Sequence, residues 1–205
     1  MKNLTYKFIE PLREYHSSES RWSTILQIAL IWLSEFKNEP HVKIYNSING
    51  ELIDTKNIFE IYRWTNENSV VEGKLNGYLF NNNKWANAFL NLSPDVVRFD
   101  PKLKEVIFIE VKTVGASVKK NIELYKELNN YMISCGWRSR LFYLMSHGHE
   151  IHSDWQLLQK VNASILIWEE LLSLLLNSPI EKLIGSDLAS YCTLPICKAT
   201  RLVDS

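Results

Sequence analysis

The chain has 205 residues, of which 46% are hydrophobic, and this length and composition suit one well-filled globular domain. Lysine plus arginine and aspartate plus glutamate both number 23, so any surface that attracts nucleic acid must come from local clustering. Three cysteines are too few for a disulfide scaffold, no apolar stretch is long enough to span a bilayer, and the charged N-terminus does not resemble a signal peptide. We therefore expect a single-domain cytoplasmic protein that does not enter a membrane.

The N-terminal part of the chain predicts one helix followed by strands. Apolar residues recur at helical spacing over residues 19–36. Two strands or a hairpin are expected within residues 42–64, where the β-branched and aromatic runs VKIY and IFEIYRW flank Asn49-Gly50, a dipeptide favoured in tight turns. The segment 70–90 is punctuated by glycine and asparagine and indicates no clear element.

A second hairpin is predicted from residues 95–99 and 105–112. The two runs are separated by Asp100-Pro101-Lys102, which is good turn chemistry. Residues 106–109 are apolar at consecutive positions, as expected for a strand that is covered on both faces. This strand should lie in the interior of a sheet.

The C-terminal part predicts a helix over residues 117–134, a strand over 140–145, and a strand over 163–167 that passes directly into a helix over 168–176. The coarse order is helix, strands, helix, strand, strand, helix. Such an order predicts an α/β fold with a mixed central sheet flanked by helices.

The second hairpin carries the residues with the clearest chemical meaning. Glu110 and Lys112 are two apart on the predicted strand, so their side chains leave one face while Val111 points to the other. Asp95 begins the preceding strand, and a tight return would bring it beside them. Paired carboxylates at a strand end suit a hard divalent ion such as Mg²⁺, to which Val111 could add its carbonyl oxygen. Lys112 would then position water or stabilise charge on a phosphate.

Pro94-Asp95, 14 intervening residues and then Glu110-Val111-Lys112 resemble the motif of the PD-(D/E)XK nuclease superfamily. The resemblance implies an enzyme that hydrolyses phosphodiester bonds with Mg²⁺ or Mn²⁺. It implies that Asp95, Glu110 and the Val111 carbonyl hold the metal and that Lys112 assists catalysis. The resemblance also makes DNA the favoured substrate, because DNA is the usual substrate in this superfamily.

The order of elements also resembles the restriction-endonuclease-like αβββαβ core, over about residues 17–176, with 177–205 as a C-terminal extension. Members commonly carry a further acid in the first helix. Glu19 looks similar to that acid, since a polar run and then an apolar stripe follow it, whereas Glu35 competes from the other end. Glu19 would act through a second metal ion or a bound water, although a carboxylate at a helix start also has a purely structural account.

Other residues are candidates for contact with nucleic acid. Four basic residues near the second long helix could contact phosphates, and ordinary surface charge explains them equally well: Lys119, Lys120, Arg138 and Arg140. Three tryptophans near predicted element ends could stack on bases, although core packing is the commoner role of such residues: Trp64, Trp85 and Trp137.

Two rival interpretations of the same fold stay open. The chain could be a catalytically silent module that binds nucleic acid or a partner protein, or it could be a nuclease directed at RNA. A homodimer is an expectation from duplex geometry, and a partner protein from a defence, repair or mobile-element system is the other possibility.

Overall fold

The computed structural model describes residues 18–48, 51–71, 92–112, 117–145, 152–175 and 178–181. Within these ranges the strands form one mixed sheet. Their bounds are β1 Lys43–Ile48, β2 Glu51–Asn57, β3 Ser69–Val71, β4 Val96–Asp100, β5 Glu105–Val111, β6 Arg138–Met145 and β7 Ser164–Ile167. The helices are α2 Ser18–Phe36, α3 Ile58–Ile61, α6 Ile122–Ser134, α7 His152–Lys160 and α8 Trp168–Leu175.

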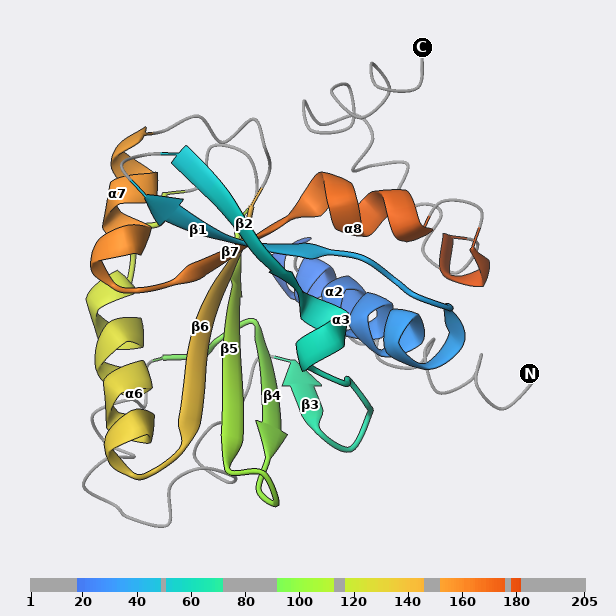
Figure 1. Ribbon diagram of the computed structural model, residues 1–205, viewed down its shortest axis with the longest axis horizontal. Helices are drawn as coiled ribbons and strands as arrows, with labels where there is room; N and C mark the ends of the chain where they lie inside the picture. The colour runs from blue at the N-terminus through green and yellow to red at the C-terminus, as the bar shows by residue number, and fades with distance from the viewer. Residues whose placement is uncertain are drawn as a thin grey trace.

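The sheet has the strand order β2-β1-β7-β6-β5-β4-β3 and is covered by helices on both faces (Figure 1). The strands β5, β6 and β7 run parallel, whereas the other neighbouring pairs are antiparallel. Parallel neighbours need a crossover connection, which α6 provides between β5 and β6 and α7 provides between β6 and β7. The predicted α/β class, with a mixed sheet flanked by helices, is confirmed.

Two hydrophobic cores lie on the two faces of this sheet. On what we call the α2 face, helices α2 and α8 pack against alternate residues of the strands, such as Ile107 and Ile109. On the opposite α6 face, α6 and α7 cover the intervening residues, such as Val106 and Phe108. Because successive side chains of a strand point to opposite faces, β5 is buried along its whole length. Its predicted interior position is confirmed.

The predicted second hairpin is confirmed as β4 and β5, within one residue at each end. The strands pair from Val96 opposite Ile109 to Asp100 opposite Glu105. In the turn, the Asp100 carboxylate accepts hydrogen bonds from the N–H groups of Lys102 and Leu103, each at 3.1 Å. The local chemistry of the turn therefore fixes how the two strands meet.

The expectation of a strand over the run IFEIYRW is wrong. The second strand of the first hairpin lies earlier, at β2, and the apolar run begins with the short helix α3. Asn57 ends the strand because its side-chain oxygen accepts hydrogen bonds from Val42 N at 3.1 Å and from Phe59 N at 3.3 Å. The second bond caps the new helix.

The helix predicted over residues 117–134 begins later, at Ile122. Asn121 has a φ of 62°, a left-handed conformation that cannot belong to the interior of a right-handed helix. Lys119 and Lys120 consequently lie in a turn and are exposed. The later start still keeps Val118 and Ile122 buried in the α6-face core.

Helix α7 was not predicted. Trp155, Leu158 and Val161 are buried at a spacing of three residues, and this spacing was a usable signal of a helix. The parallel pairing of β6 and β7 also requires a connection of this kind.

Several predicted features lie outside the described residues: the turn at Asn49-Gly50, the segment 72–91 with Trp85, the side chain of Glu19 and most of the C-terminal extension. None of the helices in the described ranges combines the length and the apolar character needed to cross a membrane.

Candidate metal and phosphodiester site

The structure brings Asp95, Glu110 and Lys112 together at the open end of the β4–β5 hairpin. Asp95 directly precedes β4 and Lys112 directly follows β5. Since Val96 lies opposite Ile109, continuing the register by one residue sets Asp95 at the level of Glu110. All three side chains belong to buried residues, with exposed fractions of 8%, 9% and 6%.

Asp95 is held from two directions. Its Oδ2 accepts a hydrogen bond of 2.6 Å from the backbone N–H of Val111, across the hairpin. Its Oδ1 accepts a hydrogen bond of 3.1 Å from the hydroxyl of Ser23, on α2. The carboxylate is therefore fixed both to the neighbouring strand and to the first helix.

Glu110 and Lys112 form a buried ion pair on the α6 face. Lys112 Nζ lies 2.6 Å from Glu110 Oε1, as expected for side chains two apart on a strand. The other oxygen, Oε2, accepts a hydrogen bond from the hydroxyl of Tyr125, on α6. Each carboxylate oxygen can accept more than one interaction, so these contacts orient the group and leave it able to bind a cation.

The two carboxylates repel each other. Burial, and then the Glu110 carboxylate, raise the pKa of Asp95 from 3.8 to about 7. The hydrogen bonds from Val111 N–H and Ser23 and the ammonium of Lys112 act in the opposite direction. Two carboxylates and one ammonium carry an excess negative charge when all are ionised, and this excess would be relieved by a positive ion.

Two buried tyrosines lie beside this charge. Tyr143 is opposite Glu110 in the parallel β5–β6 pairing, and its ring meets that of Tyr125 edge-on at 6.5 Å between centroids. Burial and the Glu110 carboxylate raise the pKa of both phenols above 10.0, so both stay protonated at neutral pH. Among the described residues the Tyr143 hydroxyl has no hydrogen-bond partner.

The donor set fits Mg²⁺ or Mn²⁺. The part of the chain that the structure describes holds no group of three His, Cys, Asp or Glu residues that could bind a metal. However, Mg²⁺ is typically bound through one or two carboxylates, with water and substrate phosphate completing its ligands. Asp95 and Glu110, with the carbonyl of the adjacent Val111, would provide that kind of oxygen site.

The two helix acids lie at opposite ends of α2. Glu19 is in the first turn, four residues before Ser23, which binds Asp95. Glu35 is exposed near the other end, twelve residues beyond Ser23, or about 18 Å of helix rise. Of the two candidates, only position 19 is near the carboxylate pair along the helix.

The two arginines predicted to contact nucleic acid lie away from the carboxylate pair, at the other end of the sheet and on its other face. Arg138 pairs with Glu105 in the β5–β6 register, five residues before Glu110, or about 17 Å along the strand. Arg140 lies two residues further along β6, opposite Ile107. Both arginines alternate with the α6-face residue Leu141, so they leave the sheet on the other face from Glu110. The two arginines therefore lie apart from Lys112.

Packing accounts for the two candidate tryptophans that the structure describes. Trp64 is fully buried in the α2-face core and cannot stack on a base. Trp137 is half-buried and stacks on Phe99, with 4.8 Å between ring centroids.

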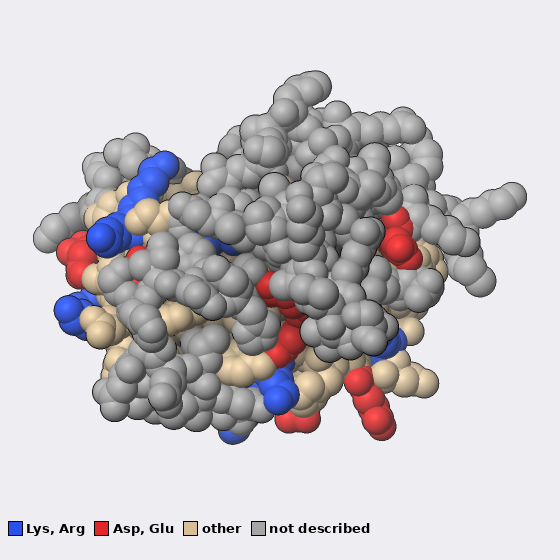
Figure 2. All heavy atoms as spheres, turned by 90° about the horizontal axis from the view of Figure 1, so that it is seen from above, with Lys and Arg blue, Asp and Glu red and all other residues tan. Residues whose placement is uncertain are grey.

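On the face of the molecule shown in Figure 2, the described lysine and arginine side chains stand apart among acidic and other residues.

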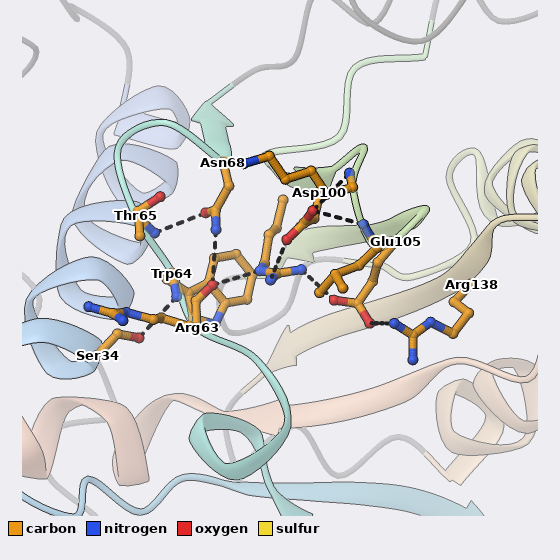
Figure 3. A network of polar contacts seen from close by, with 11 residues as sticks. Ser34, Arg63, Trp64, Thr65, Asn68, Asp100, Glu105 and Arg138 are labelled. Atoms are coloured by element: carbon orange, nitrogen blue, oxygen red, sulfur yellow. Dashed lines mark hydrogen bonds and ion pairs between the residues drawn. The ribbon is translucent and has the colours of Figure 1, made fainter.

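A second charged group, which the sequence interpretation missed, occupies the turn end of the same hairpin (Figure 3). Arg98, only 3% exposed, lies 2.6 Å from Glu105 and 3.7 Å from Asp100. Its Nε donates to the carbonyl oxygen of Arg63 at 2.8 Å, and Glu105 also lies 3.7 Å from Arg138. This group is charge-balanced, in contrast to the carboxylate pair at the open end.

Comparison of the chain with protein-family models, with curated proteins and with solved structures finds no match.

Proposed function

We propose that this protein is a metal-dependent nuclease that hydrolyses phosphodiester bonds, with its site at Asp95, Glu110 and Lys112. The observation that carries the proposal is the pair of buried carboxylates, beside a buried ammonium, at the open end of the β4–β5 hairpin. A lone structural ion pair would need one acid and one base. When both acids are ionised, the second acid instead leaves unbalanced negative charge, which a divalent cation would neutralise.

The arrangement of elements supports the same proposal. The described chain contains the order α2, β3, β4, β5, α6, β6, which corresponds to the αβββαβ order of the PD-(D/E)XK nucleases. The strands β3, β4 and β5 form an antiparallel meander, and β6 joins β5 in parallel. In this assignment β1, β2 and α3 are an insertion after the first helix, and α7, β7 and α8 extend the core.

Each residue of the site has a distinct task in this proposal. Asp95, Glu110 and the Val111 carbonyl would hold the ion, which when bound would polarise the phosphodiester and help to activate water. Lys112 would stabilise negative charge that develops on the phosphate, because it is a buried cation next to the metal ligands. Ser23 and Tyr125 would orient the two carboxylates through the hydrogen bonds described above.

Glu19 would be the helix-borne acid. The helical repeat places positions 19 and 23 on one side of α2, and Ser23 already contacts Asp95.

DNA is the favoured substrate, and RNA is the alternative. The cleavage assay described next, which includes both, separates them.

The test is a cleavage assay with supercoiled plasmid, linear duplex, single-stranded DNA and RNA, each with Mg²⁺, Mn²⁺ or chelator. Wild type should cut at least one substrate only when metal is present. Lys112→Ala should lower the rate by about 100-fold or more, the usual loss when a charge-stabilising group is removed. Lys102→Ala is the matched control, since Lys102 is exposed in the turn of the same hairpin.

Cleavage that persists in chelator, or at the wild-type rate in Lys112→Ala, would contradict the proposal. Metal-independent binding of nucleic acid without cleavage would favour the silent binding module instead.

A further inference from the structure

A cavity lies at the other end of the parallel strands, where β6 and β7 begin. Its volume is about 550 Å³, within the usual range for small-molecule sites. We call it the amino-end pocket and define it by Tyr62, Asn129, Trp137, Arg138, Arg140 and Ser164. A smaller cavity of about 180 Å³ shares Tyr62, Arg140 and Ser164 with it and adds Lys56.

Positive charge dominates the lining of these two cavities. Lys56, Arg138 and Arg140 are basic, and Glu105 is acidic. Glu105 is already compensated, because the buried Arg98 lies 2.6 Å from it and Arg138 lies 3.7 Å from it. The pocket as a whole therefore favours an anion.

Arg140 is the cation available to such an anion. It is exposed, and no hydrogen bond or ion pair joins its guanidinium to another described residue. It acts on the neighbouring Tyr62 hydroxyl, since burial raises the pKa of Tyr62 and Arg140 is the strongest of the cations that oppose this shift. A guanidinium presents paired N–H donors that match the oxygens of a phosphate.

Two asparagine side chains in the lining add further donors. Asn129 is only 6% exposed, and its side-chain oxygen accepts a hydrogen bond of 2.6 Å from the Ser139 hydroxyl. Its amide nitrogen has no partner among the described residues, although Asn129 lines the cavity. Asn46, also in the lining, accepts from the Ser164 hydroxyl at 3.1 Å and keeps its own amide group for a ligand.

We propose that the amino-end pocket is a second binding site, which takes a ligand through its phosphate group with Arg140 as the main contact. The site is separate from the carboxylate pair, because it lies at the opposite end of β5 and β6. The phosphate could belong to a free nucleotide or to the backbone of a nucleic acid. The proposal does not depend on nuclease activity.

The test is calorimetric titration of the full chain in chelator, so that metal-dependent binding and cleavage do not contribute. One probe is AMP, which carries a terminal phosphate, and the other is a short oligodeoxynucleotide with internal phosphodiesters only. At least one probe should bind wild type. Arg140→Gln should weaken that binding about tenfold or more, the factor for loss of one charged hydrogen bond.

Two control variants test whether the binding occurs at the amino-end pocket. Arg63→Gln removes an exposed arginine that lines neither cavity, and Lys112→Ala removes the cation of the carboxylate site. Neither should change the affinity. Binding of AMP alone would assign the site to a free nucleotide, and binding of the oligonucleotide would assign it to a nucleic-acid backbone. The proposal is overturned if neither probe binds, if Arg140→Gln binds as wild type does, or if Lys112→Ala alone abolishes binding.

Discussion

Tyr125 donates a hydrogen bond to Glu110 from helix α6, and so orients this carboxylate from outside its own strand. The adjacent Tyr143 is equally buried, yet its hydroxyl has no partner among the described residues. The two phenols share a ring contact and differ in what their hydroxyls do. They therefore form a matched pair for measuring what the hydrogen bond contributes.

We expect Tyr125→Phe to lower the free energy of unfolding by about 1.5 to 3 kcal/mol, because it removes a hydrogen bond to a charged, buried group. Tyr143→Phe should lower it by much less or raise it, since this change removes a buried hydroxyl that has no partner among the described residues. Urea denaturation of both variants measures the difference. Equal losses would show that the hydroxyl of Tyr125 has no special role.

The metal-free protein should lose stability as the pH rises from about 4 to about 7. The pKa of Asp95 is raised to about 7 in the folded state, so between these values the folded chain holds a proton that the unfolded chain has released. The stabilisation present at low pH therefore decreases as Asp95 ionises, by a few kcal/mol at most. Asp95→Asn should flatten this part of the profile.

Thermal unfolding in chelator across this pH range provides the measurement. Other groups also titrate, so the quantity to compare is the difference between wild type and Asp95→Asn. A difference that is constant with pH would contradict the raised pKa.

Removing Arg98 should destabilise the protein strongly. Arg98→Met leaves Glu105 buried without its main partner, and breaking a buried pair in this way costs about 3 to 5 kcal/mol. The double variant Arg98→Met with Glu105→Met should recover most of this loss, because no unpaired charge remains. Lys126→Met is the control, since its ion pair with Glu123 is exposed and should contribute little.

Denaturant unfolding of the single and double variants tests this prediction. If the double variant is no more stable than Arg98→Met, the loss comes from packing around the arginine and not from the unpaired carboxylate.

The two acids of α2 should differ in their effect on cleavage. Glu19→Gln should lower the metal-dependent rate by about tenfold or more, the usual effect of changing a group that supports a metal site. Glu35→Gln should leave the rate unchanged, because Glu35 is exposed at the far end of the helix. The comparison uses the substrate that wild type cuts best. A loss of activity in Glu35→Gln alone would reverse the assignment.

The sequence was most informative where local chemistry decides the structure. The β4–β5 hairpin followed from its turn residues and its continuous apolar run, and these two signals also placed Glu110 and Lys112 on one face. Helix α2 followed from its apolar spacing. In each case the spacing of the apolar residues and the residues at the end of the element indicated the same structure.

Predictions failed where a side chain that is distant in sequence decides the outcome. The apolar run after Asn57 fits a strand, but the Asn57 side chain accepts a hydrogen bond from Phe59 N–H and caps a helix there. The same side-chain oxygen is also bound by Val42 N–H, fifteen residues earlier. Nothing in the sequence singled out Tyr125, although a buried phenol usually needs a hydrogen-bond partner, and this requirement was the available signal. Ser23 and Arg98 carried no such signal, because their partners are set by the tertiary fold.

The Arg98–Glu105 pair also controls alignment. Shifting β4 by one residue against β5 would turn Arg98 from the α2 face into the α6-face core and so take it away from Glu105. A shift of two residues that brings Arg98 opposite Ile109 would keep the faces but separate the arginine from Glu105. The ion pair therefore disfavours these shifts and helps to keep Asp95 level with Glu110. It does so without touching either residue, since Arg98 lies about 10 Å from Asp95 along β4 and Glu105 about 17 Å from Glu110 along β5.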